Sequence, residues 1–301
     1  MKFLESKLSD GLGKRNIAKY CRWLEVSRQG FYKYSNRPKR VWRHEDLAAE
    51  IRAIIAEDEW NDNYGKKRIL EALKLRHPDS DLPSITTIYR IMNQMGICRK
   101  KKHKPNGITK ADREARKSED ILKRDFQADK PFTKCITDIT EIPVKGGKLY
   151  VSAIFDCYHL ECLGLAIDSN MKAGLCVRTL ADAKNKHPEL RGAIIHSDRG
   201  SQYTSHEYRE ALSRHGFVQS MNSDGGRCHD NARAESMWAR MKEELLYNRH
   251  DTKTMAADEV KSIIWRYYKS YWNNRRICSS IGGMPPRVKL ENYKYSLKMV
   301  A

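Results

Sequence analysis

Three short, strand-like runs joined by minimal links constrain the fold of this chain more than any other feature. Residues 135–142, 149–156 and 161–167 are rich in apolar and β-branched side chains, and only a few residues separate one run from the next. Links this short, one of them containing Gly146 and Gly147, join strands that are antiparallel neighbours. We therefore expect a three-stranded antiparallel meander in the middle of the chain.

Helical and strand-like patterns alternate after these runs. In order, we expect a helix over 171–185, a strand over 193–196, a helix from a capping box at 204–207 to Gly216, a strand over 217–221, and a helix from 230 to about 247. The resulting order is βββαβαβα. Such an order predicts an α/β fold in which helices cover a sheet that has an antiparallel edge.

The first hundred residues show helical patterns only. A helix near residues 15–24, a break at Glu25 and a second segment capped by Ser27 have helix-turn-helix proportions. Further helices are expected over 44–56 and 68–75, and Ser84 caps a last one. The inner face of that last helix is apolar, and its outer face suits a recognition helix in a DNA major groove, although any small helical bundle shows similar pairs. The outward residues are Thr86, Thr87, Arg90 and Asn93.

Charge is segregated along the chain. The 301 residues carry 57 Lys+Arg against 38 Asp+Glu, a net charge of +19. Residues 1–130 contain 31 basic and 19 acidic side chains, residues 131–260 contain 17 and 18, and residues 261–301 contain 9 and 1. Two basic arms around a neutral centre are typical of a protein that neutralises phosphates with its flanks.

The basic segment after the first helices reads as a linker. It has no apolar periodicity, ends at Pro105, and contains Lys100, Lys101 and Lys102, which either touch phosphate or belong to a solvated tether. A charged helix over 111–126 is expected to follow. We therefore expect a helix-turn-helix region at 1–98, a linker and helix at 99–128, and a catalytic core with a basic C-terminal helix and tail at 129–301.

The sequence also excludes some classes of protein. No stretch approaches the roughly 20 apolar residues that span a bilayer, and the N-terminus has no signal-peptide pattern. Eight cysteines are scattered without a Cys-x-x-Cys pair. We expect reduced thiols in a cytoplasmic protein without a membrane partner.

Three acids lie where the expected topology would bring them together. Asp138 lies inside the first strand among apolar neighbours, where a carboxylate is costly unless it is paired or bound to metal. Asp198 follows the fourth strand, at the edge where open α/β sheets keep their sites. Glu235 lies one turn into the last long helix of the core. Oxygen ligands of this kind suit Mg²⁺ or Mn²⁺, and a pair of such ions supports phosphodiester displacement.

Four segments carry a specific family resemblance. HSDRGSQYTS (196–205), TDIT (137–140), DNARAES (230–236) and YWNNRR…GGMPP (271–286) resemble the DDE transposases of bacterial insertion sequences, in particular the OrfB-type proteins of the insertion sequence three group. The resemblance covers nearly the whole chain. It implies a retroviral-integrase-like, RNase H-like core and a catalytic triad of Asp138, Asp198 and Glu235 that binds two metal ions.

The resemblance also suggests a basic contact to DNA and shows two departures. Lys242 matches a basic residue two helical turns after the glutamate, where it could contact a phosphate or remain solvated. Between Asp198 and Glu235 lie 36 residues, one more than the group usually has, and Cys278 replaces a usual His. In the aromatic C-terminal segment we expect most rings to pack and the basic residues, including Arg275 and Arg276, to meet DNA.

These observations predict a transposase that cleaves and joins DNA strands with Mg²⁺ or Mn²⁺. Its expected partners are double-stranded DNA, as terminal inverted repeats and target, and further copies of itself. By resemblance, the chain is also expected to be fused to or partnered with an upstream-frame helix-turn-helix protein, in a bacterial, nucleoid-associated setting. Two alternatives remain open: a catalytically inactive or partial transposase that represses by binding DNA, and a nuclease for RNA–DNA hybrids.

Overall fold

The computed structural model describes residues 17–36, 42–98, 118–123, 125–222, 232–247 and 249–300. The chain divides into two compact units, Met1–Glu50 and Ile51–Ala301. This division differs from the boundary expected at residue 98, because the later N-terminal helices pack with the core. Ile277 N donates a 3.0 Å hydrogen bond to Tyr64 Oη, and Asn63 Nδ2 donates one of 3.2 Å to the Glu244 carbonyl.

The first unit contains the expected helix-turn-helix elements. Helices α2 (Ile17–Trp23) and α3 (Arg28–Ser35) are separated by a turn in which Glu25 has a φ of 55°. Ser27 caps α3 by accepting a hydrogen bond from Gly30 N at 2.9 Å. A small core formed by Ile17, Cys21 and Phe31 holds the pair of helices together.

Three more helices follow: α4 (Glu45–Ala56), α5 (Lys66–Arg76) and α6 (Ile85–Gln94). As expected, Ser84 caps α6 by accepting a hydrogen bond from Thr87 N. Ile88, Ile91 and Met92 are buried on its inner face, as the 3.6-residue period predicts.

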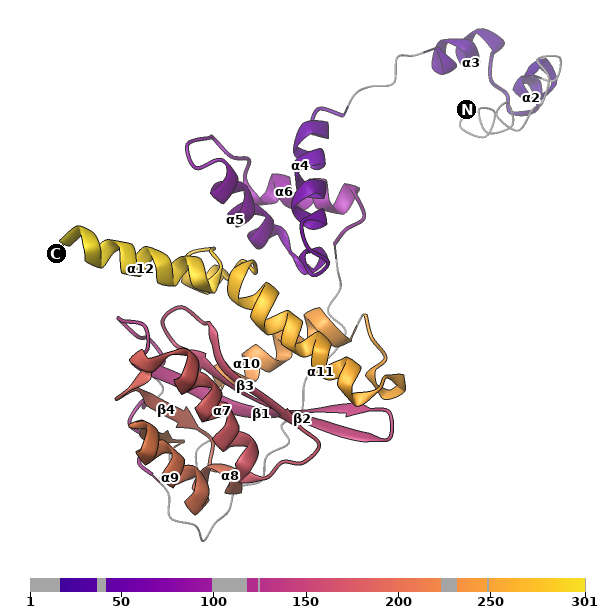
Figure 1. The fold of residues 1–301 in the computed structure, drawn as a ribbon. Coiled ribbons are helices and arrows are strands. Elements are labelled where there is room, and N and C mark those ends of the chain that lie inside the picture. The colour runs from indigo at the N-terminus through magenta and orange to yellow at the C-terminus, as the bar shows by residue number, and fades with distance from the viewer. Residues whose placement is uncertain are drawn as a thin grey trace. The chain divides into compact units, whose positions relative to one another are not determined.

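The core contains one five-stranded mixed sheet (Figure 1). Its strands are β1 (Lys134–Val144), β2 (Gly147–Asp156), β3 (Cys162–Asp168), β4 (Ile194–Ser197) and β5 (Val218–Met221). The strand order is β3-β2-β1-β4-β5. The first three strands are antiparallel, which confirms the expected meander, whereas β4 and β5 run parallel to β1.

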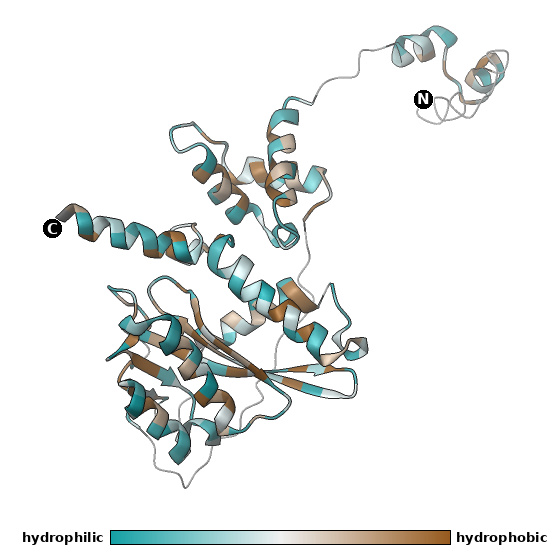
Figure 2. Ribbon diagram, viewed as in Figure 1, coloured by the Kyte–Doolittle hydropathy of each residue, from teal (hydrophilic) through white to brown (hydrophobic). Residues whose placement is uncertain are grey.

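Helices cover both faces of the sheet. On one face lie α7 (Ala173–Lys186) and α9 (His206–His215), and the strands are largely hydrophobic in Figure 2. On the other face α10 (Ala232–Met241) packs against β1, and the Trp238 ring centroid lies 5.8 Å from that of Phe155. The architecture is the α/β arrangement expected from the order of elements, and it matches the RNase H-like integrase core that the family resemblance implies.

The C-terminal segment adds α11 (Ala257–Arg266) and α12 (Pro286–Val300), with π-helical turns at Lys242–Leu246 and Tyr267–Trp272. Short helices complete the described elements: α8 (Ser201–Thr204) and 3-10 turns at Asn61–Asn63, Pro188–Leu190, Thr252–Thr254 and Ser279–Ile281. No helix in the described part of the chain is both long enough and apolar enough to cross a membrane.

Three local expectations need correction. The second helix of the core starts one residue late, because Ser205 rather than Thr204 caps it through Tyr208 N. The expected helix over 111–126 is absent from its described residues, 118–123 and 125–126. Residues 118–121 instead satisfy the otherwise open edge of β5, where Ile121 N donates a 3.0 Å hydrogen bond to Ser220 Oγ.

The third correction concerns the long helix expected to reach about Tyr247. The regular α-helical part ends at Met241, and a π-helical turn from Lys242 to Leu246 continues the chain. Such wide turns inside helices are frequent at functional sites because they re-aim the side chains that follow.

Candidate active site

The register of β1 and β4 aligns two of the predicted acids. The strands are parallel, and Ile136 pairs with His196. Asp138 and Asp198 each lie two residues beyond this pair, so they occupy equivalent positions on neighbouring chain segments. Parallel neighbours lie about 4.8 Å apart. The topology therefore brings the two carboxylates to one place on the sheet.

Asp138 is a buried carboxylic acid. Its residue is 8% exposed, and its antiparallel partner is Ala153. Burial raises the pKa of the Asp138 carboxyl well above its usual range, and the negative charges of Asp198 and Glu235 raise it further. The buried indole of Trp238 favours the ionised form and offsets part of this effect. This carboxylate is costly for the protein, which is typical of a functional group.

Asp198 is half-buried in the turn that leaves β4. Its Oδ1 accepts a hydrogen bond from Gly200 N at 2.9 Å. A Cβ on Gly200 would lie only 3.0 Å from the same oxygen, so a larger residue would crowd the Asp198 carboxylate. On the preceding residues, His196 lies 2.9 Å from Ser220 Oγ, which holds the ends of β4 and β5 together.

Glu235 is exposed in the first turn of α10. This helix packs against β1, and Trp238, one turn further on, is buried against the sheet. The positive end of a helix favours an ionised carboxylate. From this position on the helix, the charge of Glu235 raises the pKa of the Asp138 carboxyl.

The donor set suits a hard divalent cation. Carboxylate oxygens are the ligands that Mg²⁺ and Mn²⁺ prefer. The negative charges of Asp198 and Glu235 raise the pKa of Asp138, and a bound cation would relieve this repulsion. Within the described residues, no group of three His, Cys, Asp or Glu side chains is close enough together to hold a metal ion. The three acids are neighbours, but they do not form a closed coordination shell.

Lys242 lies beside this cluster. It is half-buried at the start of the π-helical turn, where burial lowers the pKa of its ammonium group and the charges of Glu141 and Asp138 raise it. It lines a cavity of about 780 Å³ together with Glu141 and Tyr247. The predicted contact of Lys242 with a DNA phosphate stays a prediction.

Comparison with known proteins places these features in a family. Two family models, each described as "Integrase core domain", match this chain, one over residues 128–228 and the other over residues 217–286. These ranges contain Asp138, Asp198 and Glu235. Transposase InsF for insertion sequence IS3A of Escherichia coli (strain K12) is 27% identical over 274 residues, covering 90% of this chain and 92% of that protein. The chain has an integrase core domain, and over nearly its whole length it is similar to transposases of the IS3 family.

The chain is also similar to a second curated relative and to two solved structures. The putative transposase InsK for insertion sequence element IS150 of E. coli (strain K12) is also 27% identical over 274 residues, covering 91% of this chain and 93% of that protein. Among solved structures, a simian T-cell lymphotropic virus intasome gives a TM-score of 0.46 at 15% identity, covering 72% of this chain and 68% of that one. The HTLV-2 integrase catalytic core domain in complex with magnesium gives 0.40 at 13%, covering 54% and 98%.

The residues predicted to contact DNA occupy different environments in this chain. On α6, Thr86, Arg90 and Asn93 are exposed, whereas Thr87 is half-buried with its hydroxyl 3.1 Å from Ser84 Oγ. The linker residues Lys100, Lys101 and Lys102 lie outside the described residues. The outer face of α6 is therefore exposed, as a helix that enters a DNA groove requires.

The two C-terminal arginines differ sharply. Arg275 is exposed, and its Nη1 lies 2.8 Å from Asp58 Oδ2. Arg276 is 1% exposed and uses Nε and Nη2 to bind both oxygens of Glu244, at 2.8 and 2.6 Å. The expected DNA contact at Arg276 is corrected accordingly, because its guanidinium already serves an internal ion pair. The neighbouring Cys278 is buried, and Arg276 Nη1 donates to its Sγ at 3.2 Å.

Sequence reasoning did not identify Glu244 as the centre of this network. Arg68 Nη2 lies 2.9 Å from Glu244 Oε1, and Tyr267 Oη donates to Oε2 at 2.8 Å. Burial alone would raise the pKa of Glu244, but Arg276 and Arg68 lower it to about 2. The available signal was an acid three residues after the buried Met241, on the apolar side of its helix.

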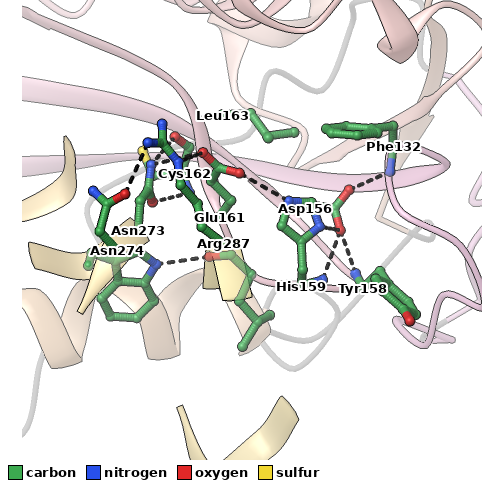
Figure 3. A network of polar contacts seen from close by, with 12 residues as sticks. Phe132, Asp156, Tyr158, His159, Glu161, Cys162, Leu163, Asn273, Asn274 and Arg287 are labelled. Atoms are coloured by element: carbon green, nitrogen blue, oxygen red, sulfur yellow. Dashed lines mark hydrogen bonds and ion pairs between the residues drawn. The ribbon is translucent and has the colours of Figure 1, made fainter. Parts of the chain in front are cut away.

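A second buried network lies at the C-terminal end of β2, around Asp156 (Figure 3). His159 Nδ1 is 2.7 Å from Asp156 Oδ1, and Nε2 is 3.3 Å from Glu161 Oε2. Asp156 also accepts from Phe132 N, and Asn273 Nδ2 donates to Glu161. This network connects the C-terminal segment to the antiparallel meander of the integrase core.

Proposed function

We propose that this chain is a DDE transposase that cleaves and joins DNA strands, with Asp138, Asp198 and Glu235 as its catalytic carboxylates. One observation supports the proposal most directly: Asp138 is buried, and two other carboxylates raise its pKa. A protein keeps such an arrangement at a cost in stability, and it becomes favourable when a divalent cation neutralises the cluster.

The proposed reaction has two displacements. In the first, water attacks a phosphodiester at the end of the element, the P–O3′ bond breaks, and a free 3′-OH and a 5′-phosphate result. In the second, that 3′-OH attacks a target phosphodiester, a new P–O bond forms, and the target's own 3′ oxygen leaves. Phosphorus is neither oxidised nor reduced, and neither step needs a covalent intermediate with the protein.

The three acids and Lys242 would have different roles in this reaction. Asp138 and Asp198 would hold a shared ion, and Glu235 would complete a second site. Mg²⁺ or Mn²⁺, proposed as two ions, would supply activation of the attacking oxygen and stabilisation of the leaving one. Lys242 would hold a DNA phosphate beside the acids. Because Glu235 is exposed and the shell is open, we expect Glu235 to close on the two aspartates when DNA and metal bind.

The expected substrates are the terminal inverted repeats and a target duplex. The exposed face of α6 and the basic linker would recognise the repeats, by direct and phosphate contacts respectively. Joining two ends requires at least two active sites, so we propose a homo-oligomer. Pairing with or fusion to an upstream-frame helix-turn-helix protein would add recognition of the ends.

A strand-nicking and joining assay on DNA with the native flanking ends tests this reaction. We expect products in Mg²⁺ or Mn²⁺ and at least about a hundredfold loss with Glu235→Gln. Glu259→Gln is the matched control, because it removes the same charge from an exposed position on α11. Equal cleavage by both variants would refute the role of Glu235. Preferential cleavage of an RNA–DNA hybrid would indicate a different substrate.

A DNA-binding repressor is the second candidate function. The observation that favours it is the open arrangement of the three acids within the described residues. On this view, wild type and Glu235→Gln bind end DNA equally well, and neither cuts it with either metal. Addition of the upstream product then separates an inactive protein, which stays inactive, from a partial enzyme that gains activity.

A further inference from the structure

A second cavity, of about 690 Å³, lies between the start of α5, α6 and the end of α10. Five cationic side chains and three carboxylates line it, which leaves an excess of positive charge. Volumes of this size are typical of ligand sites. Arg240 lies five residues after Glu235 on α10, so the two side chains project from different sides of the helix. The cavity is therefore separate from the carboxylate site.

The guanidinium groups at this cavity are not fully satisfied by the protein. Glu244 is shared between Arg276 and Arg68, and the remaining Nη1 of Arg68 is buried without a hydrogen-bond partner. Arg240 makes no hydrogen bond or ion pair within the described part of the chain. Burial lowers the pKa of Arg240, and the charges of Arg276 and Arg68 lower it further. An anion in this cavity would relieve that repulsion.

The first turn of α5 gives independent support. Its N-cap is Gly65, so no side chain accepts from the free backbone N–H groups that begin the helix. The first three residues, Lys66, Lys67 and Arg68, are all basic, and all line the cavity. Cations at the positive end of a helix are unfavourable unless an anion binds there.

We propose that this cavity binds a backbone phosphate of duplex DNA. The proposal rests on the proposed function, because α6 also lines the cavity through Tyr89 and Met92. A duplex held by the exposed Arg90 and Asn93 of that helix would run past the cavity. Lys66 Nζ lies 4.9 Å above the Tyr89 ring, which joins the cavity to that face. Phosphate contacts of this kind fix the register of a protein on its DNA.

Binding of a labelled duplex of the gene's own flanking DNA, in EDTA and over a range of salt concentrations, tests the assignment. We expect Arg240→Gln to weaken binding by about tenfold and to reduce the slope of log affinity against log salt by about one. Arg240→Lys should keep the slope because it keeps the charge. Arg214→Gln is the matched control on exposed α9, and we expect it to behave like wild type.

Thermal unfolding checks that the variants are folded. Arg240→Gln should unfold at or above the wild-type temperature, since it removes a repelled cation. Equal affinities and salt slopes for Arg240→Gln and Arg214→Gln would overturn the proposal. If inorganic phosphate raises the unfolding temperature of wild type but not of Arg240→Gln, while both bind the duplex equally, the occupant is free phosphate and the DNA assignment is also overturned.

The binding assay is independent of strand cleavage. Metal-dependent cleavage by wild type combined with unchanged DNA binding by Arg240→Gln would refute the phosphate site alone. Conversely, Arg240→Gln could bind DNA more weakly and with a smaller salt slope while the wild type never cuts DNA. That pair of results would support the phosphate site and refute the proposed reaction.

Discussion

Asp138 shows how a single residue can cost stability for the sake of chemistry. Its carboxylate is buried, and nearby negative charges raise its pKa. We expect Asp138→Asn to raise the free energy of unfolding without metal by about 1–2 kcal/mol at neutral pH, because it removes a desolvated charge. The same substitution should abolish strand cleavage. Urea unfolding in EDTA and the nicking assay measure the two effects.

The opposite outcome is informative in the same experiment. A loss of stability on Asp138→Asn would mean that the carboxylate is satisfied inside the protein, and the argument for a metal site would fail. Asp258→Asn provides the control, because this acid is exposed on α11 and interacts only with Lys261 among the contacts described for it. Its effect on the free energy of unfolding should be small compared with that of Asp138→Asn.

At the scale of elements, the join between β2 and β3 contains a buried histidine whose charge supports the fold. Burial lowers the pKa of His159, but Asp156 and Glu161 outweigh this and raise it from 6.5 to about 8. Because the folded pKa is the higher one, the stabilisation is fully present below pH 6.5 and is lost as the pH rises through 8. We expect a loss of about 2 kcal/mol between pH 6.5 and 9 that is absent in His159→Gln.

Urea unfolding at several pH values measures this difference. Burial lowers the pKa of nearby His187, and because His159→Gln keeps His187, the difference between the two curves reports on His159. Arg287 Nε, 3.2 Å from Glu161 Oε1, stays charged throughout. Parallel curves for wild type and His159→Gln between pH 7 and 9 would show that the imidazole is neutral in the folded protein.

Regular elements of this fold could be predicted from local pattern, but contacts between distant segments could not. Alternation and short links identified the meander, and Ser27 and Ser84 marked two helix starts because a hydroxyl cap acts within one turn. The helix expected over 111–126 is absent from its described residues, because residues 118–121 bond instead to the open edge of β5. The position of Asp138 beside Asp198 followed from topology, whereas the partners of Glu244 lie far away in sequence and left no local signal.

On the scale of the whole molecule, Glu244 connects segments that the sequence separates. Arg68 reaches it from α5, and Arg276 and Tyr267 reach it from the C-terminal segment, while Glu244 itself follows the helix that contains Glu235. This arrangement explains why residues 51–98 belong to the same compact unit as the core. It also explains why one arginine of the basic tail is internal rather than a DNA contact.

We therefore expect Glu244→Gln to lower the free energy of unfolding more than any other conservative substitution outside the carboxylate site. It leaves two partly or fully buried guanidinium groups without their counter-charge, which costs about 3–5 kcal/mol. Urea unfolding of Glu244→Gln, Arg276→Met and the double variant forms a mutant cycle. Because the double variant removes both buried charges, its loss of stability should be smaller than the sum of the two single losses. Additive losses would show that Glu244 and Arg276 act independently.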